Sequence, residues 1–294
     1  MDYQGTFYSG GRPLPFILSI PDDKDVEQKF PAVVLCHGHS RYYGDGLDKL
    51  AAKLVENGIA SLRFDFSGCG ERALRRYHLY CASQWPQDLS SAVSFLRKFS
   101  QIDSDRVGVA GISMGACTAL YQAGVDSRIK SVVSMAGIAD CGSWLEGVWQ
   151  RSNGDWPSFY RMLESDHTNA AVTGESRIVN VLEMYNESDE AKAAVVAETL
   201  VEPDINAYVS LDSLYQLVGY RPIEHCPGIT CDALILHGES DTLVPIENAK
   251  TIFNAIPAAN KKLHVYEGID HNIPRHERRD MVFEDIVTWF TNSL

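Results

Sequence analysis

Short apolar runs alternate with amphipathic stretches along most of the chain. The apolar runs have the composition of strands buried on both faces of a sheet and cover residues 31–36, 59–66, 107–112, 129–136, 231–237 and 263–266. Helical periodicity or helix-forming composition follows most of them, over residues 47–56, 86–99, 116–123, 246–256 and 277–294. This repeated order of strand and helix predicts an α/β fold with a mostly parallel central sheet and helices on both faces.

The sequence also predicts a hairpin near the start of the chain and a turn before one of the apolar runs. Residues 3–8 and 14–20 alternate enough between apolar and polar positions to predict two strands, and the two glycines at 10–11 are typical of a hairpin connection. Residues 103–105, with the sequence Asp-Ser-Asp, precede the run at 107–112 and are expected to form a turn.

The segment 138–226 interrupts the alternation of strands and helices. Nothing in it has the composition of a buried parallel strand, whereas residues 190–200 and 211–218 suit helices. We therefore predict an α/β core made of residues 1–137 and 227–294, with residues 138–226 inserted between two core strands as a helical cap.

Composition places the chain among ordinary globular proteins. It has 294 residues, of which 45% are hydrophobic and 22% charged, and no run of 18 apolar residues that would predict a membrane span. The first residues, 1–5, do not have the basic and apolar pattern of a signal peptide. The seven cysteines are scattered without zinc-ligand spacing. Reduced thiols and a cytoplasmic location are the expectation.

The net charge of the chain is −13. Such a charge argues against nucleic acid or an anionic membrane as a partner. The expected partner is a small-molecule substrate, and the sequence leaves a homodimer open.

The strongest candidate for chemistry is the pattern Gly111-x-Ser113-x-Gly115, which stands between an apolar run and a helix-forming run. A strand, a sharp turn and a helix with a serine at the apex form the nucleophile elbow of serine hydrolases. Glycine is needed two residues to either side because a side chain there would collide with neighbouring backbone. Ser113 is therefore the candidate nucleophile, although the pattern alone also arises by chance and needs partners elsewhere in the chain.

A serine nucleophile needs a histidine base and a carboxylate that orients the base. In α/β-hydrolases the acid and then the histidine follow the serine along the chain. Asp241 comes just after the run at 231–237, and His271 comes just after the run at 263–266. The carboxyl ends of parallel strands carry the sites of open α/β sheets, so Asp241 and His271 are the predicted acid and base.

Each partner has alternatives. Asp241 could instead cap the helix that follows it, and Glu239 is a rival acid on the same loop. Asp270 belongs to the loop of the candidate histidine and not to that of the acid. His276 is expected to begin or flank the last helix, and the imidazole of His237, at the end of a strand, is expected to be structural.

An oxyanion hole requires two backbone N–H groups that point at the developing negative charge. Met114, directly after the candidate nucleophile, is expected to provide one at the start of a helix. His39 is expected to provide the other from the loop after the run at 31–36. The dipeptide at 37–38 also suits a tight turn, and the two interpretations are compatible. His37 and His39 lack a carboxylate partner, so no metal is expected.

These segments together resemble the α/β-hydrolase superfamily over nearly the whole chain. The segments similar to the feruloyl/cinnamoyl esterase and dienelactone-hydrolase-like group are His37-Gly38-His39, residues 63–71 (RFDFSGCGE), Gly111-Ile112-Ser113-Met114-Gly115, residues 237–241 (HGESD) and Asp270-His271. The resemblance implies Ser113 as nucleophile, Asp241 as acid, His271 as base and the amides of His39 and Met114 as oxyanion hole. It implies no cofactor.

The predicted activity is that of a serine hydrolase that cleaves a carboxylic ester through an acyl-enzyme. Trp144, Trp149 and Trp156 in the predicted cap suggest an aromatic or apolar acyl group, but they could equally serve only to pack the cap. Three arginines at 72, 75 and 76 could meet a substrate carboxylate or form a solvated face. A C–C bond hydrolase or another specialised enzyme with the same triad, an acylaminoacyl-type peptidase, and an inactive ligand-binding protein are alternatives.

Overall fold

A computed structural model describes residues 1–22, 29–39, 44, 46–69, 84–180 and 208–294 of the chain. The helix predicted at 190–200 and the arginines at 72, 75 and 76 lie outside the described residues. The chain divides into two compact units. Unit 1 comprises Met1–Phe66, Trp85–Ala139 and Pro222–Leu294, and unit 2 comprises Ser67–Gln84 and Asp140–Arg221.

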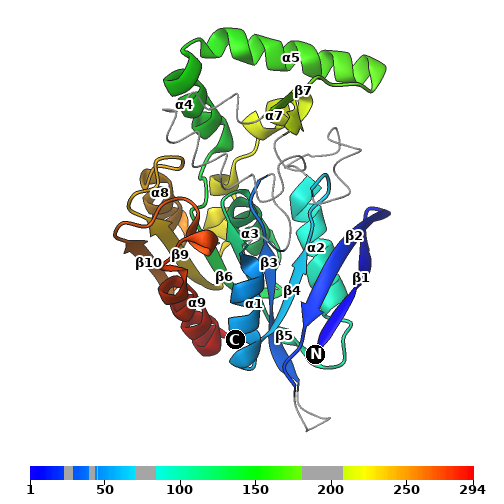
Figure 1. The fold of residues 1–294 in the computed structure, drawn as a ribbon, viewed down its shortest axis with the longest axis vertical. Helices are drawn as coiled ribbons and strands as arrows, with labels where there is room; N and C mark the ends of the chain where they lie inside the picture. Colours follow the sequence, from blue (N-terminus) through cyan, green and yellow to red (C-terminus); the bar gives the residue numbers. More distant parts are fainter. Residues whose placement is uncertain (23–28, 40–43, 45, 70–83, 181–207) are drawn as a thin grey trace. The chain divides into compact units, whose positions relative to one another are not determined.

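Unit 1 contains an eight-stranded sheet with the order β1-β2-β4-β3-β5-β6-β9-β10 (Figure 1). The strands are β1 (Asp2–Ser9), β2 (Arg12–Ser19), β3 (Phe30–Cys36), β4 (Ala60–Phe64), β5 (Ile102–Ile112), β6 (Ile129–Met135), β9 (Asp232–Gly238) and β10 (Lys261–Tyr266). The pairs β1–β2 and β2–β4 are antiparallel, and every pair from β4 to β10 is parallel. This architecture is the α/β-hydrolase fold, so the predicted fold class is confirmed.

Strand β5 begins earlier than the sequence predicts. The prediction of a turn at 103–105 is wrong, because these residues belong to the strand. Phe30 of β3 pairs with Ile102, but the next pair joins Ala32 to Val107, so β5 carries additional residues that β3 does not match. Such an irregularity interrupts the apolar pattern, since the additional residues are polar and are half-buried or exposed.

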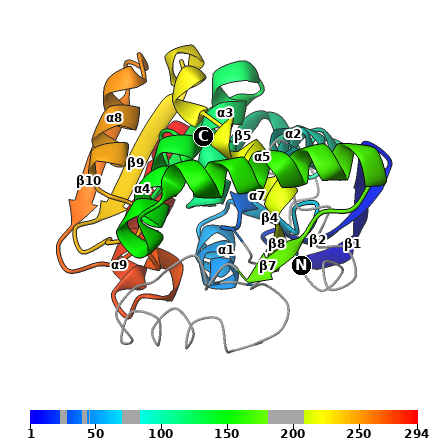
Figure 2. The same ribbon diagram turned by 90° about the horizontal axis from the view of Figure 1, so that it is seen from above.

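Helices cover both faces of the unit 1 sheet, as Figure 2 shows. The helices α1 and α9 lie on one face, and α2, α3 and α8 lie on the other. Their bounds are α1 (Leu47–Glu56), α2 (Trp85–Leu96), α3 (Met114–Val125), α8 (Glu247–Ala255) and α9 (Arg279–Ser293). Helices are required on both faces because the parallel strands are apolar on both.

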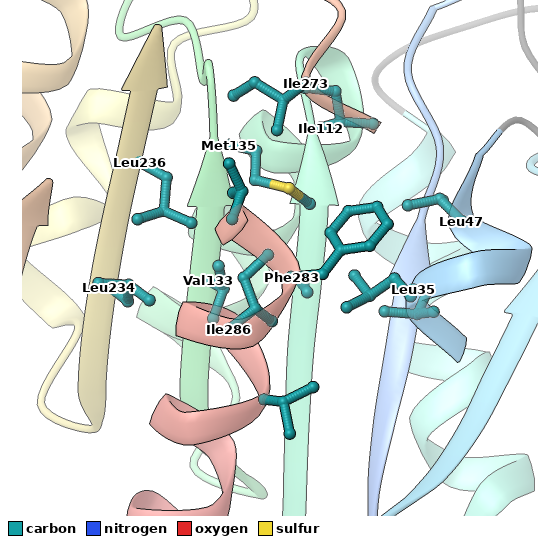
Figure 3. Packing of buried hydrophobic residues seen from close by; sticks show 14 of the residues in the cluster. Leu35, Leu47, Ile112, Val133, Met135, Leu234, Leu236, Ile273, Phe283 and Ile286 are labelled. Atoms are coloured by element: carbon teal, nitrogen blue, oxygen red, sulfur yellow. The ribbon is translucent and has the colours of Figure 1, made fainter. Parts of the chain in front are cut away.

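The core between the sheet and α9 shows how closely the layers pack. Phe283 and Ile286 of α9 lie over the side chains of the central strands, among them Val133 (Figure 3). Gly108 in β5 is required there, because an added Cβ would stand 2.7 Å from the ring of Phe290.

Among the helices of the described residues, none is long and apolar enough to cross a membrane.

In the residues that the structure describes, unit 2 contains helices and one short antiparallel strand pair. Its elements are α4 (Cys141–Asn153), α5 (Trp156–Thr173), β7 (Ile178–Asn180), β8 (Tyr208–Ser210) and α7 (Leu211–Val218). Asp140, Asp155 and Ser210 cap the three helices, each accepting a backbone N–H of the first turn. The helix predicted at 211–218 is confirmed as α7.

Candidate active site

Ser113 stands between the end of β5 and the start of α3 in an uncommon backbone conformation. Its φ is 54° and its ψ is −121°, and its N–H donates to the carbonyl of Met135 in β6 at 2.9 Å. A positive φ in a residue other than glycine costs about 1–3 kcal/mol and persists only where the surroundings impose it. The predicted strand, turn and helix with a serine at the apex are therefore present, and the Ser113 side chain is only half-buried.

The two glycines that flank the serine are sterically required. A Cβ on Gly111 would stand 2.2 Å from the carbonyl oxygen of Gly115. A Cβ on Gly115 would stand 2.2 Å from the carbonyl oxygen of Cys36 and 2.4 Å from that of His37. The second approach brings the first turn of α3 against the end of β3, so the segments that carry Met114 and His39 meet at Gly115.

Replacing Gly115 with alanine is expected to destabilise the protein by about 2–4 kcal/mol, because two backbone carbonyls must move to admit the methyl group. Thermal unfolding should report a Tm lower by roughly 5–10 °C. Gly5→Ala in β1 is the matched control, since its added Cβ would meet only the end of the Phe16 ring at 3.2 Å. A Gly115→Ala protein as stable as Gly5→Ala would contradict the close approach.

Asp241 and His271 are joined directly. Nδ1 of His271 donates to Oδ2 of Asp241 at 2.8 Å, and the Asp241 side chain is fully buried. The other carboxylate oxygen, Oδ1, accepts the backbone N–H groups of Val244 at 2.7 Å and Leu243 at 3.0 Å. Asp241 can therefore cap the next turn and orient the histidine at the same time, because each role uses a different carboxylate oxygen.

The loops that carry this pair are held together by backbone contacts. The N–H of Glu239 donates to the carbonyl of Tyr266 at 2.9 Å, and the N–H of Ser240 donates to the carbonyl of Ile269 at 3.0 Å. Gly238 makes the approach feasible, since a Cβ there would stand 2.2 Å from the Ile269 oxygen. The distance between Asp241 and His271 is therefore set by rigid backbone at the ends of β9 and β10.

The rival residues do not form this pair. Glu239 is exposed, and Asp270 accepts the N–H of Asn272 at 2.9 Å. His276 accepts the N–H of Arg278 through Nδ1 at 3.1 Å. None of the three bonds to His271 in the part of the chain that the structure describes.

His237 is buried directly behind the acid. Its Nε2 donates to the carbonyl of Val244 at 2.8 Å and stands 3.5 Å from Oδ2 of Asp241, and its side chain is fully buried. Burial lowers the pKa of His237, and the Val244 carbonyl and the Asp241 carboxylate offset part of that effect. The sequence indicated a structural imidazole, and the contacts show that it supports the loop of the candidate acid.

This lowered pKa predicts a loss of stability in mild acid. Below the ordinary histidine pKa of about 6.5 the unfolded chain takes up a proton that the native His237 does not, so stability falls as pH decreases through this range. The Tm of the wild type should therefore drop more between pH 7.5 and pH 5.5 than that of His237→Gln, which keeps an N–H donor but does not titrate. Parallel curves for the two proteins would refute the lowered pKa of His237.

The strand order brings the three candidate residues to one edge of the sheet. Ser113 follows β5, Asp241 follows β9 and His271 follows β10, and these strands lie parallel with only β6 intervening. Within the described residues, Ser113 and His271 make no hydrogen bond with each other. Catalytic hydrogen bonds are often long without substrate and shorten only in the complex.

The candidates for the oxyanion hole are at the ends of neighbouring elements. Met114 is the first residue of α3 and is buried, and His39 follows β3 and is half-buried. The positive end of the α3 dipole is directed at the same region as the Met114 amide. Both amides thus come from the segments that meet at Gly115.

The three tryptophans belong to α4 and α5 of unit 2. The Trp149 ring stacks on Phe159 with 3.5 Å between centroids, and the centroid of Trp156 lies 5.7 Å from that of Phe159. Trp149 also donates through Nε1 to the carbonyl of Asp155 at 3.1 Å. These contacts account for Trp149 and Trp156 as packing residues of unit 2, and Trp144 is half-buried in α4.

Two other kinds of side chain, metal ligands and thiols, can be located in the described part of the chain. No three histidine, cysteine, aspartate or glutamate side chains gather there as a metal site. The cysteines at 36 and 117 are buried, free thiols, and burial raises the pKa of Cys36 far above its usual range.

Comparison with known proteins identifies the family of the chain. Residues 27–279 match the family model Hydrolase_4, described as serine aminopeptidase, S33. An uncharacterized 31.7 kDa protein in the traX-finO intergenic region of Escherichia coli is 26% identical over 249 residues, which cover 82% of this chain and 86% of that protein.

Two solved structures share the fold. DcsB in complex with its substrate analogue has a TM-score of 0.84 and 17% identity, covering 100% of this chain and 99% of its own. Est1E from Butyrivibrio proteoclasticus with bound ferulic acid has a TM-score of 0.70 and 16% identity, covering 98% of each chain. The predicted resemblance is thereby confirmed: the chain is a serine hydrolase of the α/β-hydrolase superfamily and belongs to the Hydrolase_4 (serine aminopeptidase, S33) family.

Proposed function

We propose that this serine hydrolase cleaves a carboxylic ester through an acyl-enzyme formed on Ser113. The observation that carries the proposal is the 2.8 Å bond between the buried carboxylate of Asp241 and His271 Nδ1, at the sheet edge where Ser113 occupies the elbow. The bond leaves Nε2 of His271 as the basic nitrogen, since Nδ1 carries the proton.

The proposed reaction has two balanced halves. Ser113 Oγ attacks the ester carbonyl while Nε2 of His271 takes its proton, and the tetrahedral intermediate collapses when His271 returns that proton to the leaving alcohol. Water then attacks the acyl-enzyme, again with His271 as base, and releases the carboxylic acid and the free serine. Asp241 stabilises the transient imidazolium without taking the proton.

The backbone amides of His39 and Met114 are proposed to bind the oxyanion in both halves. A hydrogen-bond donor aimed at the oxyanion typically contributes about 10²–10³ in kcat. The close contact at Gly115 supports this assignment, because it holds together the two segments that would supply the donors.

An ester with an aromatic or apolar acyl group is the substrate class that we favour. Ferulic acid, bound to the structural neighbour Est1E, is an aromatic carboxylic acid of the kind that ester cleavage releases. Trp144, Trp149 and Trp156 are the aromatic residues considered for this acyl group. Trp149 and Trp156 also pack on Phe159, so substituting each of the three tryptophans in turn tests which of them contacts the acyl group.

A fluorophosphonate probe with intact-mass readout tests the proposal, followed by a panel of alkyl, aryl and cinnamoyl esters and aminoacyl p-nitroanilides. We expect a single adduct at Ser113 and turnover of esters, fastest with an aromatic acyl group. Labelling with cleavage of the anilides alone would favour a peptidase, the activity that the family description names. Labelling without any turnover would move the proposal to a specialised substrate such as a C–C bond. Absence of labelling would reject an activated Ser113.

A further inference from the structure

His37 is a fully buried histidine outside the proposed triad. It follows the last residue of β3 and has no exposed surface. Its ring packs edge-on against Phe66 and Trp85, with centroid distances of 5.1 and 5.5 Å. Both ring nitrogens also contact backbone, and these contacts determine which nitrogen carries the proton.

The contacts of His37 fix its tautomer. The backbone N–H of Phe66 lies 3.1 Å from Nε2, and an N–H group can only donate, so Nε2 is an acceptor. The carbonyl oxygen of Gly38 lies 2.7 Å from Nδ1, and a carbonyl can only accept, so Nδ1 carries the proton. The neutral imidazole with its proton on Nδ1 satisfies both partners, whereas a second proton would face the Phe66 N–H.

The acceptor of this bond belongs to the peptide unit that ends in a proposed oxyanion donor. The carbonyl of Gly38 and the N–H of His39 share one peptide plane, and in a trans peptide they point in opposite directions. A bond that holds the Gly38 oxygen toward the buried ring therefore holds the His39 N–H away from it. Rotation of this plane would misdirect the N–H without removing it.

We infer that His37 is a positioning residue, which orients the oxyanion hole by holding the Gly38–His39 peptide through Nδ1. The inference rests on the proposed function, because the His39 amide matters only if an oxyanion forms at Ser113. The N–H of Phe66 contributes to this role. It requires an acceptor at Nε2, so the proton of the ring stays on Nδ1, from which it is donated to the Gly38 oxygen.

Two substitutions separate the two bonds of the ring. The side-chain amide of asparagine has a nitrogen as many bonds from Cα as Nδ1, so His37→Asn can still donate to the Gly38 oxygen. The amide of glutamine corresponds to Nε2, so His37→Gln can accept from Phe66 but loses the donor to Gly38. Both replacements remove the same ring packing, which makes each the control for the other.

The measurements are kcat and KM for an aryl ester, with kcat expressed per fluorophosphonate-titrated site so that unfolded protein does not count. We expect His37→Gln to lower kcat about 10- to 100-fold and His37→Asn to lower it no more than about 3-fold, with KM nearly unchanged in both. An aryl trifluoromethyl ketone, which places an oxyanion in the hole when it adds to Ser113, should lose affinity for His37→Gln by the same factor as kcat/KM.

A purely structural role would lower the Tm of both variants and would not separate their kcat values. Equal losses of kcat in the two variants, or a His37→Gln protein within about 3-fold of the wild type, would overturn the inference. Ser113→Ala is measured in parallel: if it keeps full activity, the proposed function itself fails, and if it is inactive, the comparison concerns His37 alone.

Discussion

Ser113→Ala is expected to lower kcat for an activated aryl ester by about 10⁴- to 10⁶-fold, because it removes the atom that forms the acyl-enzyme. The remaining rate would come from the oxyanion hole and from binding. KM should change little, since the hydroxyl contributes to the transition state more than to ground-state binding. Steady-state kinetics with one ester measures the effect. The Ser113→Ala variant and the fluorophosphonate-treated wild type are compared with the untreated wild type, because substitution and labelling should abolish the same activity.

The loss should not come from unfolding. The Ser113 hydroxyl makes no hydrogen bond within the described part of the chain, and alanine keeps the same Cβ at a φ of 54°. The Tm should therefore stay within about 2 °C of the wild type. Ser240→Ala removes an exposed hydroxyl from the loop before Asp241 and is the control, with activity expected within about 2-fold. A Ser113→Ala protein that keeps a tenth of the activity would exclude Ser113 as nucleophile.

The central strands were predictable because they are buried on both faces. A parallel strand such as β3 or β9 has few polar residues except where it ends, so its position is evident from composition alone. The error at 103–105 has the opposite cause. Those residues belong to β5 but lie where its pairing with β3 shifts register, so their polar side chains have the composition of a turn.

The order of Ser113, Asp241 and His271 along the chain was enough to nominate them, because each follows an apolar run. Their supports were not predictable. The approach of Gly238 to Ile269 joins loops about 30 residues apart, whereas the placement of His237 behind Asp241 depends on how the chain turns within a single loop. Composition does not encode the first contact, although two His-Gly dipeptides, each at the end of a strand, were a visible signal.

The aromatic residues of unit 2 show another limit of a single sequence. Trp149 and Trp156 attract attention by their spacing and chemistry, yet both contact Phe159 within the same unit. Large aromatic side chains tend to be buried, but their positions in the sequence do not indicate whether another side chain or a ligand buries them. Only the contacts in the fold distinguish the two.

Asp241→Asn is expected to reduce kcat by about 10³- to 10⁴-fold while the fold is kept. The amide oxygen can still accept the N–H groups of Leu243 and Val244. The amide nitrogen then faces Nδ1 of His271, and two donors cannot share one bond. The imidazole must therefore accept through Nδ1 and carry its proton on Nε2, which leaves no base for the Ser113 hydroxyl.

Glu239→Gln is the matched control, since it neutralises the rival carboxylate two residues away on the same loop. Glu239 is exposed, so its loss should change kcat by no more than about 3-fold and should leave the Tm unchanged. Measuring kcat, KM and Tm for both variants on one aryl ester separates the two carboxylates. If Glu239→Gln were the inactive variant, the exposed carboxylate would have to reach His271 in solution. The 2.8 Å bond between Asp241 and His271 would then describe a resting arrangement and not the working one.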